Sequence, residues 1–172
     1  MKIRRLEPAD IRACERILRA LPEWFGIEES NRAYIGDLDT LPSYVAIADG
    51  DVAGFLSLKH HFPAASEIHV LAVERSLHRL GIGRALVERA EAGLRAAGVA
   101  LLQVKTLGPS NPDEGYRKTR EFYKALGFVA LEETTVPWGP GQPVADHGES
   151  AGQSHLNGRE SATRHSHMRV LA

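Results

Sequence analysis

Glycines and arginines gather in residues 73–86, whose sequence is Val-Glu-Arg-Ser-Leu-His-Arg-Leu-Gly-Ile-Gly-Arg-Ala-Leu. This pattern predicts a strand that runs through a glycine-containing turn into a helix. Unpaired backbone N–H groups converge at a helix N-terminus and the helix dipole favours negative charge, so the turn is a candidate anion site. Arg75, Arg79 and Arg84 could add charge-assisted bonds to phosphate oxygens. The alternative is a tight turn with solvated arginines.

Two common phosphate-binding motifs are absent from the sequence. A dinucleotide-binding fingerprint needs a third glycine at position 86, where Leu86 stands. A P-loop needs Gly-Lys-Ser or Gly-Lys-Thr, and neither tripeptide occurs in the chain. The ligand of the turn is therefore expected to be neither NAD nor ATP.

A strand followed by Arg-or-Gln-x-x-Gly-x-Gly and a helix resembles the acetyl-CoA motif of the GNAT family of N-acetyltransferases. In this chain the motif is His78-Arg-Leu-Gly81-Ile-Gly83, with histidine in first place. A second stretch, Glu121-Phe-Tyr-Lys-Ala-Leu-Gly127-Phe128, is similar to the family's late helix and strand, in which a tyrosine faces the acetyl thioester. Both motifs occur in the family's order, and the resemblance covers roughly residues 1–136.

The resemblance implies a binding mode for acetyl-CoA as co-substrate, with no metal. Backbone groups of Leu71 and Val73 would bond pantetheine as though it were an extra strand, and the amides of residues 79–84 would hold the pyrophosphate. Because amides need no particular side chain, histidine in place of Arg or Gln leaves this cradle intact. Tyr116 and Thr119 depart from the Asn and Ala of many relatives, which leaves a side-chain contact to pantetheine unsupported. The implied cofactor-binding residues are Leu71, Ala72, Val73, His78, Arg79, Leu80, Gly81, Ile82, Gly83 and Arg84.

Glu67 and His69 are the candidate bases for the amine acetylation that the resemblance implies. An ammonium has no lone pair and must lose a proton before it attacks the thioester carbonyl. Glu67 is the first candidate, because residues 66–73 resemble the strand that carries the glutamate base in histone-type members of the family. His69 lies on the same side of a regular strand, and an imidazole, with a reference pKa of ~6.5, suits a base or relay. Either group could act through water; a solvated carboxylate and a semi-buried histidine are the alternatives.

Tyr123 and the pair Trp24 and Phe25 are the other candidate site residues. A phenol is a hydrogen-bond donor at neutral pH, so Tyr123 could protonate the departing CoA thiolate or hold it by a hydrogen bond. Its alternative role is packing on the sheet. Trp24 and Phe25 lie between two predicted helices, beside Pro and Gly, and could form a wall that grips an aliphatic or aromatic amine. Closing the core is an equal alternative for these two rings.

Alternating strand and helix patterns within residues 1–136 must position these groups. Strands are predicted at residues 2–6, 43–48, 52–60, 67–73, 100–106 and 128–134, and helices at residues 11–21, 28–38, 82–97 and 116–126. Asp49-Gly50-Asp51 marks a hairpin between two antiparallel strands. A helical crossover joins residues 67–73 to residues 100–106 in parallel. The predicted fold class is therefore α/β, a mixed sheet with helices on both faces, as the GNAT resemblance also implies.

The composition changes near Pro137 and divides the chain into a domain at residues 1–136 and a tail at residues 137–172. The tail holds five Gly, three Pro, four Ser and four of the eight His. It has too few large apolar residues to offset the entropy of ordering, so it is expected to be largely disordered. Residues 168–171 alone are strand-like. Either they return across a long loop to supply the family's last strand, or they stay disordered, the preferred outcome, and the open edge pairs with a second copy as a homodimer.

Charge and hydropathy exclude several classes of protein. Twenty-one Lys and Arg against 22 Asp and Glu leave a formal charge of −1, which removes the whole-domain positive field of a nucleic-acid binder. No apolar stretch approaches the ~20 residues of a membrane helix, and the N-terminus lacks the apolar core of a secretory signal. A cytoplasmic location is therefore expected. Cys14, the single cysteine, cannot form an internal disulfide, and its place on a helical apolar stripe indicates the core.

The expected function is transfer of the acetyl group of acetyl-CoA to a primary amine by direct attack in a ternary complex. The alternative is a non-catalytic CoA-binding sensor or regulatory domain of the same fold; the presence of both Glu67 and Tyr123 favours the enzyme. Peptide N-termini, lysines, polyamines, aminoglycosides and amino acids all stay open as acceptors, because specificity resides in variable loops. Neither a nucleic acid nor a membrane is an expected partner.

Overall fold

The computed structural model describes residues 1–134, 144–145 and 168–171. The α-helices are α1 (Ile11–Arg19), α2 (Glu28–Asp37), α3 (Ile82–Ala96) and α4 (Glu114–Ala125), with 3₁₀ turns η1 (Pro8–Asp10) and η2 (Arg75–Leu77). The strands are β1 (Lys2–Arg5), β2 (Ser43–Ala48), β3 (Asp51–Phe62), β4 (Ala65–Val73), β5 (Leu101–Val104), β6 (Val129–Ala130), β7 (Glu133–Thr134), β8 (Val144–Ala145) and β9 (Met168–Leu171). All four predicted helices and the first five predicted strands occur near their expected positions.

Seven of the described strands form one mixed sheet, in the order β1-β2-β3-β4-β5-β9-β6. The strands β1 to β4 pair antiparallel in succession, and β4 pairs in parallel with β5. Asp49 and Gly50, between β2 and β3, have φ angles of 53° and 94°. Positive φ at both central residues is typical of a tight hairpin turn. The predicted α/β fold with a mixed sheet is confirmed.

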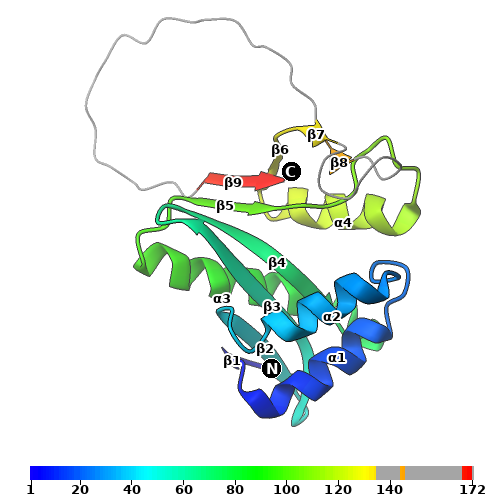
Figure 1. The fold of residues 1–172 in the computed structure, drawn as a ribbon, viewed down its shortest axis with the longest axis vertical. Coiled ribbons are helices and arrows are strands. Elements are labelled where there is room, and N and C mark those ends of the chain that lie inside the picture. Colours follow the sequence, from blue (N-terminus) through cyan, green and yellow to red (C-terminus); the bar gives the residue numbers. More distant parts are fainter. Residues whose placement is uncertain (135–143, 146–167, 172) are drawn as a thin grey trace, which may run out of the picture.

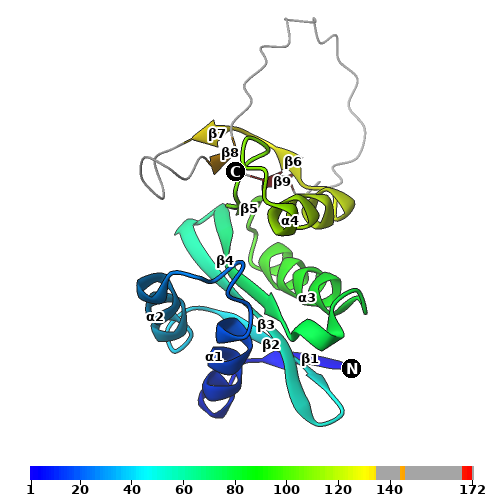
Figure 2. The same ribbon diagram turned by 90° about the vertical axis from the view of Figure 1, so that its right-hand side faces the viewer.

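Helices cover both faces of the sheet (Figure 1 and Figure 2). The helix α3 packs on β2, β3 and β4 and buries an apolar stripe that includes Leu86 and Leu94. The helix α1 packs on the opposite face of β3 and β4 and buries Cys14, Ile17 and Leu18. Burial raises the pKa of the Cys14 thiol to about 12, so this cysteine is an ordinary core residue. No helix in the described ranges is long and apolar enough to span a bilayer.

The strand β4 changes its partners part-way along its length. It pairs with β5 from Ala65 to Ile68, and that pairing then stops. On its other side, a register shift at Ser57 leaves His69 without a partner in β3. Such a β-bulge bends a strand. Residues 69–73 therefore continue beside β3 with a free edge on the side where β5 has diverged.

The C-terminal strands differ from the prediction. The strand expected at residues 128–134 is divided between β6, in the main sheet, and β7, which pairs with β8 in a two-stranded sheet. Between β5 and β6 lies β9, parallel to both. Residues 144–145 and 168–171, in the tail that was expected to be largely disordered, form strands. For β9 the reason is that an exposed sheet edge offers unpaired backbone groups that a returning strand can satisfy. The rest of the predicted disordered tail, with its four histidines, lies outside the described residues.

Candidate active site

The glycine turn opens α3 and leaves backbone amides available. Gly81 directly precedes the helix with a φ of 83°, a left-handed conformation that glycine adopts without strain. The N–H of Ala85 donates to the Gly81 carbonyl at 3.0 Å. The N–H groups of residues 82–84, in the first turn, have no acceptor within the helix and can bind an anion. The predicted strand, turn and helix are confirmed.

The three arginines near this turn have different surroundings. The Arg75 guanidinium pairs with Glu23, with 2.5 Å between Nη2 and Oε2. Arg84 lies 4.0 Å from Glu88 along α3. Arg79 is exposed and has no ion-pair partner within the described part of the chain. Of the three, Arg79 is therefore the most available to an anionic ligand.

Gly83 lies where the start of α3 meets α4. A Cβ atom added at Gly83 would lie 3.1 Å from the Phe122 ring and 3.9 Å from a methyl group of Val73. The first distance is tighter than ordinary van der Waals contact. Gly83 therefore allows the close approach of α3 and α4, in addition to the role that the sequence indicated for it at the anion site.

The free edge of β4 presents the backbone groups of alternate residues. Glu74 donates its N–H to the Ala53 carbonyl at 2.9 Å, which makes Val73 part of a non-hydrogen-bonded pair with β3. Hydrogen-bonded and non-hydrogen-bonded pairs alternate along an antiparallel ladder. The N–H and C=O groups of Val73 and Leu71 consequently face away from β3, whereas those of Ala72 face β3.

His78 occupies the motif position where the GNAT pattern has Arg or Gln. Its Nε2–H donates to the Val73 carbonyl at 2.9 Å, since a carbonyl can only accept. Its ring also lies edge-on to Trp24, with the ring centroids 6.0 Å apart. This side chain connects the glycine turn to β4 and leaves the Val73 N–H, and both backbone groups of Leu71, for a ligand.

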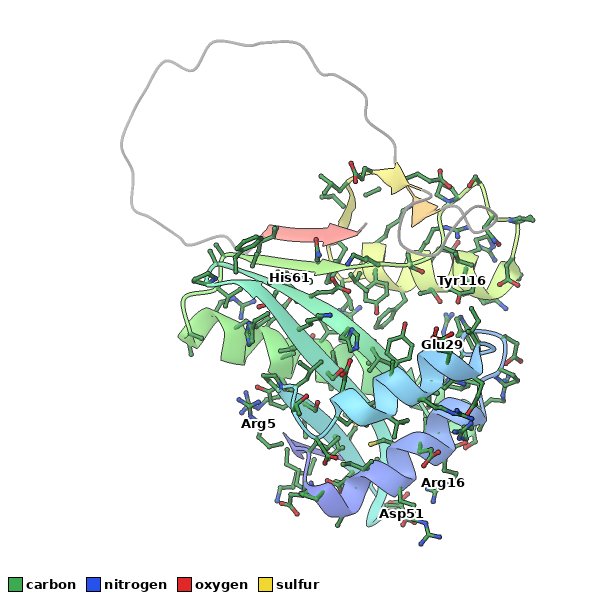
Figure 3. The ribbon with its side chains drawn as sticks, in the orientation of Figure 1. Arg5, Arg16, Glu29, Asp51, His61 and Tyr116 are labelled. Carbon is green, nitrogen blue, oxygen red and sulfur yellow. The ribbon has the colours of Figure 1, made fainter. Side chains whose placement is uncertain are left out.

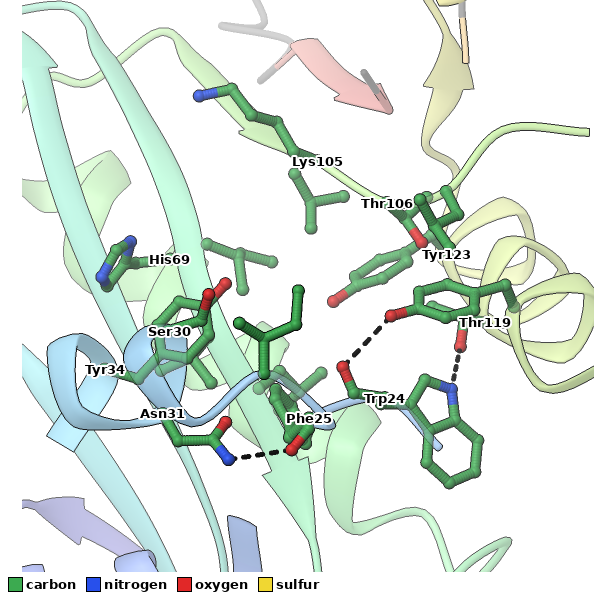
Figure 4. Close-up of a pocket in the computed structure, with 17 residues that line it drawn as sticks. Trp24, Phe25, Ser30, Asn31, Tyr34, His69, Lys105, Thr106, Thr119 and Tyr123 are labelled. Atoms are coloured by element: carbon green, nitrogen blue, oxygen red, sulfur yellow. Dashed lines mark hydrogen bonds between the residues drawn. The ribbon is translucent and has the colours of Figure 1, made fainter. Parts of the chain in front are cut away.

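A cavity of about 140 Å³ lies where β4 and β5 diverge (Figure 4). The 17 residues that line it come from the loop before α2, from α2, from β4, from the end of β5 and the loop after it, and from α4. Trp24 and Phe25, the predicted acceptor wall, are both in the lining, with Tyr34 and Tyr116. Leu71 is also in the lining, so the cavity meets the free edge of β4.

Trp24 is held in place by α4. Its Nε1–H donates to Thr119 Oγ1 at 3.1 Å, and the Tyr116 hydroxyl donates to the Trp24 carbonyl at 3.1 Å. Tyr116 and Thr119 are the two residues that depart from the family pattern on this helix. In the structure, the hydrogen bonds of these two residues attach α4 to Trp24 in the wall of the cavity.

Tyr123 extends from α4 with its hydroxyl toward the interior of the cavity (Figure 4). The residue is 5% exposed, and its ring packs edge-on against Phe122 and Phe128. Burial raises the pKa of the phenol above its ordinary value of 10. Tyr123 is therefore a protonated hydrogen-bond donor over the whole physiological range of pH.

Glu67 is buried beside the cavity, and three side chains donate to one oxygen of its carboxylate. Its Oε2 accepts from Lys105 Nζ at 2.7 Å, His61 Nε2 at 2.7 Å and Gln103 Nε2 at 3.1 Å. His61 lies at the end of β3 nearest β5 (Figure 3). Burial raises the pKa of Glu67, but hydrogen bonds from Lys105 and His61 outweigh it, so the pKa is lowered overall. Lys105 lines the cavity, whereas Glu67 does not.

His69 lies in the cavity lining, at the bulge of β4. Its Nε2 is 2.9 Å from Asp37 Oδ2, and the Tyr34 ring lies edge-on to the imidazole with centroids 5.1 Å apart. A carboxylate only accepts hydrogen bonds, so the proton is on Nε2 and Nδ1 carries a lone pair in the neutral imidazole. Within the described residues, Nδ1 has no hydrogen-bond partner. His69 and Tyr123 stand at opposite ends of the lining (Figure 4).

The structure thus gathers most of the predicted side chains around one cavity and separates one of them from it. His69, Tyr123, Trp24 and Phe25 share the lining. Glu67 is outside the lining and pairs with Lys105, which belongs to it. Sequence reasoning missed Lys105, Asp37, Tyr34, His61 and the new roles of Tyr116 and Thr119. No local pattern marks these residues, because their contacts join distant parts of the chain.

Comparison with known proteins identifies the family of the chain. The model of the family described as acetyltransferase (GNAT) domain matches residues 40–130. An uncharacterized N-acetyltransferase of Chlorobaculum tepidum is 33% identical over 94 residues, which cover 55% of this chain and 54% of that protein. The chain therefore spans about half the length of this curated relative.

Solved structures share the fold at low sequence identity. A GNAT-family protein from Desulfovibrio desulfuricans has a TM-score of 0.72 and 21% identity, over 84% of this chain and 94% of that one. An aminoglycoside 6'-N-acetyltransferase complexed with coenzyme A has a TM-score of 0.68 and 19% identity, over 84% and 94%. These likenesses show the fold, and the family model matches more than half of the chain. The chain belongs to the GNAT family of acetyltransferases.

Proposed function

We propose that this protein transfers the acetyl group of acetyl-CoA to a primary amine by direct attack in a ternary complex. The observation that carries the proposal is the position of Tyr123, a protonated phenol aimed into a cavity that also contains Leu71 on the free edge of β4. A strand edge, an anion-binding helix start and a proton donor thus meet at one place. Membership of the GNAT family supports this function.

The residues present fit CoA. The outward N–H and C=O of Leu71 and the N–H of Val73 can pair with the amides of pantetheine, as a neighbouring strand would. The free amides of residues 82–84 and the Arg79 guanidinium can hold the pyrophosphate. The thioester of acetyl-CoA supplies the activated acetyl group.

His69 is the proposed proton acceptor for the amine. It lines the cavity, its Nδ1 lone pair is free among the described residues, and Asp37 orients the ring by holding Nε2–H. Because His69 stands across the cavity from Tyr123, the proton passes through water that bridges the amine and the imidazole.

Glu67 acts as a positioning residue in this proposal. Three donors share its Oε2, and its lowered pKa makes it a weak proton acceptor. Its carboxylate fixes the ammonium of Lys105 at the rim of the cavity. Tyr123 donates a hydrogen bond to the sulfur as the thiolate departs, which stabilises the developing charge.

Calorimetry with acetyl-CoA, followed by release of free thiol in the presence of a panel of amines, tests the proposal. Binding together with amine-dependent thiol release supports an acetyltransferase. Binding without thiol release from any amine class would replace the proposal with a non-catalytic CoA-binding sensor. Absence of acetyl-CoA binding by the folded protein would overturn both.

A further inference from the structure

The charge of the cavity lining restricts the amine that can bind there. Among the 17 described residues of the lining there is no Asp and no Glu, and Lys105 carries the only permanent charge. A polyamine or an aminoglycoside presents several ammonium groups, each of which loses hydration on binding and needs a carboxylate or several acceptors in return. This lining offers no carboxylate, and its buried side-chain oxygens without a partner among the described residues, Asn31 Oδ1 and Thr106 Oγ1, are neutral.

The two carboxylates nearest to the lining already have donors. Glu67 accepts from three side chains, including Lys105. Asp37 accepts from His69. A second or third ammonium of a ligand would compete with contacts that the folded protein already makes. The site is therefore poorly suited to a polycation.

Lys105 is, in contrast, the one permanently charged residue among the described lining, and its ammonium lies at the outer end of the cavity, away from Tyr123 (Figure 4). Its side chain is 33% exposed, whereas that of Glu67, whose Oε2 is 2.7 Å from the Lys105 ammonium, is 9% exposed. An ammonium has three N–H donors, and Glu67 is the one described acceptor of Lys105. A ligand carboxylate bound to Lys105 would be closer to the ammonium than to Glu67, so attraction exceeds repulsion because Coulomb energy falls with distance.

The size and chemistry of the cavity indicate the rest of the ligand. Its walls include the rings of Trp24, Phe25 and Tyr34, which favour an apolar group. Its volume is about 140 Å³. An apolar cavity of roughly 150 Å³ engineered in another protein holds benzene, so one ring or one branched aliphatic side chain fits here.

We propose that the acceptor is an α-amino acid with one apolar side chain, whose carboxylate is bound by Lys105. This inference rests on the proposed acetyl transfer and names its substrate class. In the reaction, an N–C bond forms between the α-amine and the acetyl carbonyl carbon, and the C–S bond breaks. The neutral amine loses a proton to His69 through water, and the sulfur leaves as a thiolate that accepts a hydrogen bond from Tyr123. The thiolate becomes the thiol when His69 returns that proton through water.

Matched acceptors that differ in one group test the role of the carboxylate. Phenylalanine, phenylalaninamide and spermidine are compared by kcat/KM for thiol release from acetyl-CoA. The wild-type protein should acetylate phenylalanine best and spermidine least. Lys105→Gln should lower kcat/KM for phenylalanine by about 10- to 100-fold, mainly through KM, and leave phenylalaninamide nearly unchanged. Comparing variant with wild type for each acceptor removes differences in intrinsic amine basicity.

Two further lysine variants serve as controls. Lys105→Arg keeps the charge and should restore most of the preference for phenylalanine. Lys2→Gln removes an exposed lysine from β1, at the far edge of the sheet, and should change nothing. Equal losses for phenylalanine and phenylalaninamide in Lys105→Gln would overturn the inference, since they would show a general structural effect.

A binding measurement on the wild-type protein needs no variant. Calorimetry should show N-acetylphenylalanine, a product, binding about 10-fold more tightly than N-acetylphenylalaninamide. Preferential acetylation of spermidine or of phenylalaninamide would overturn this inference and leave acetyl transfer intact. Acetyl-CoA binding with no thiol release from any amine would instead contradict the proposed function itself.

Discussion

The two halves of β4 differ in how many of their backbone and side-chain polar groups have hydrogen-bond partners within the protein. Residues 65–68 pair with β3 on one side and with β5 on the other. Glu67, in this closed half, accepts hydrogen bonds from three neighbouring side chains at its Oε2. Residues 69–73 have lost β5, contain the bulge at His69 and present Leu71 to the cavity. One strand thus has a closed half and an open half.

The difference explains why we place the proposed site in the open half of β4. Backbone N–H and C=O groups that are paired within a sheet cannot bind a ligand, whereas unpaired ones need a partner. The side chains differ in the same way. The charge of Glu67 is already paired with that of Lys105, whereas the Nδ1 of His69 has no partner among the described residues. The proposed site lies in the open half, where the backbone groups of Leu71 and the Nδ1 of His69 have no partner among the described residues.

The largest expected effect comes from exchanging the titratable side chain in each half. His69→Gln keeps a polar side chain but removes the proton acceptor, so kcat should fall by about 10²- to 10⁴-fold. Glu67→Gln should lower kcat by less than about 10-fold, because Glu67 acts only through Lys105. Steady-state thiol release at neutral pH measures both variants.

The pH profile separates the two roles further. Loss of a base should be partly compensated at high pH, where more of the amine is free, so the deficit of His69→Gln should shrink as pH rises. A large, pH-dependent loss in Glu67→Gln together with full activity of His69→Gln would reverse the assignment. Glu67 would then be the base, as the sequence indicated first.

The next largest effect concerns the anion site beyond the open half. Gly83→Glu puts a carboxylate at the start of α3 and should weaken acetyl-CoA binding by about 100-fold or more, measured by calorimetry. Gly36→Glu, in α2, is the matched control because a Cβ there meets open space. The side chain at position 83 also approaches Phe122, so thermal unfolding must show that the variant folds.

A second variant keeps this test decisive. Arg79→Glu changes an exposed side chain that has no ion-pair partner in the described ranges. It should weaken acetyl-CoA binding by about 10-fold without a change in stability. Unchanged affinity in both folded variants would place the pyrophosphate elsewhere.

A smaller decrease in kcat is expected when Tyr123, the proposed hydrogen-bond donor to the thioester sulfur, is changed. Tyr123→Phe removes the hydroxyl and should lower kcat by about 10- to 100-fold, with acetyl-CoA affinity close to that of wild type. The raised pKa of Tyr123 keeps the phenol protonated above pH 10. The wild-type rate should therefore show no alkaline loss below that pH. Stopped assays of thiol release across pH 7–10 would contradict the assignment if the rate declined.

Local patterns predicted the elements that carry the proposed site residues, and the resemblance to the GNAT family assigned Tyr123 its proposed role. The turn at Gly81 and the helix that carries Tyr123 follow from glycine placement and helical periodicity, which depend on neighbouring residues. Trp24 and Phe25 were found because two aromatic residues stand beside helix-breaking residues. The order of strands and helices, and hence the fold class, followed from the same signals.

Contacts between distant elements could not be predicted in this way. Asp37 and His69 are 32 residues apart, and Lys105 and Glu67 are 38 residues apart. The bulge at His69 also leaves no mark in an alternating pattern. Strand β9 pairs with β5 across a long stretch of sequence, and chain composition alone favoured disorder there. Tertiary pairing decides these features.

The smallest expected effect is on the stability of the closed half as the pH changes. The pKa of Glu67 is lowered from its ordinary value of 4.5, so the folded state favours the charged carboxylate. A lowered pKa contributes stability above the unfolded value, and that contribution is lost as pH falls through the folded pKa. Thermal unfolding should therefore show the wild-type protein melting a few degrees above Glu67→Gln at neutral pH, with the difference in melting temperature shrinking below about pH 4.5.

Glu132→Gln, at an exposed position after β6, is the control and should show no such dependence on pH. A difference between wild type and Glu67→Gln that stays constant from pH 7 to pH 3 would mean that the carboxylate contributes by shape alone, and that the closed half is not held by its charge.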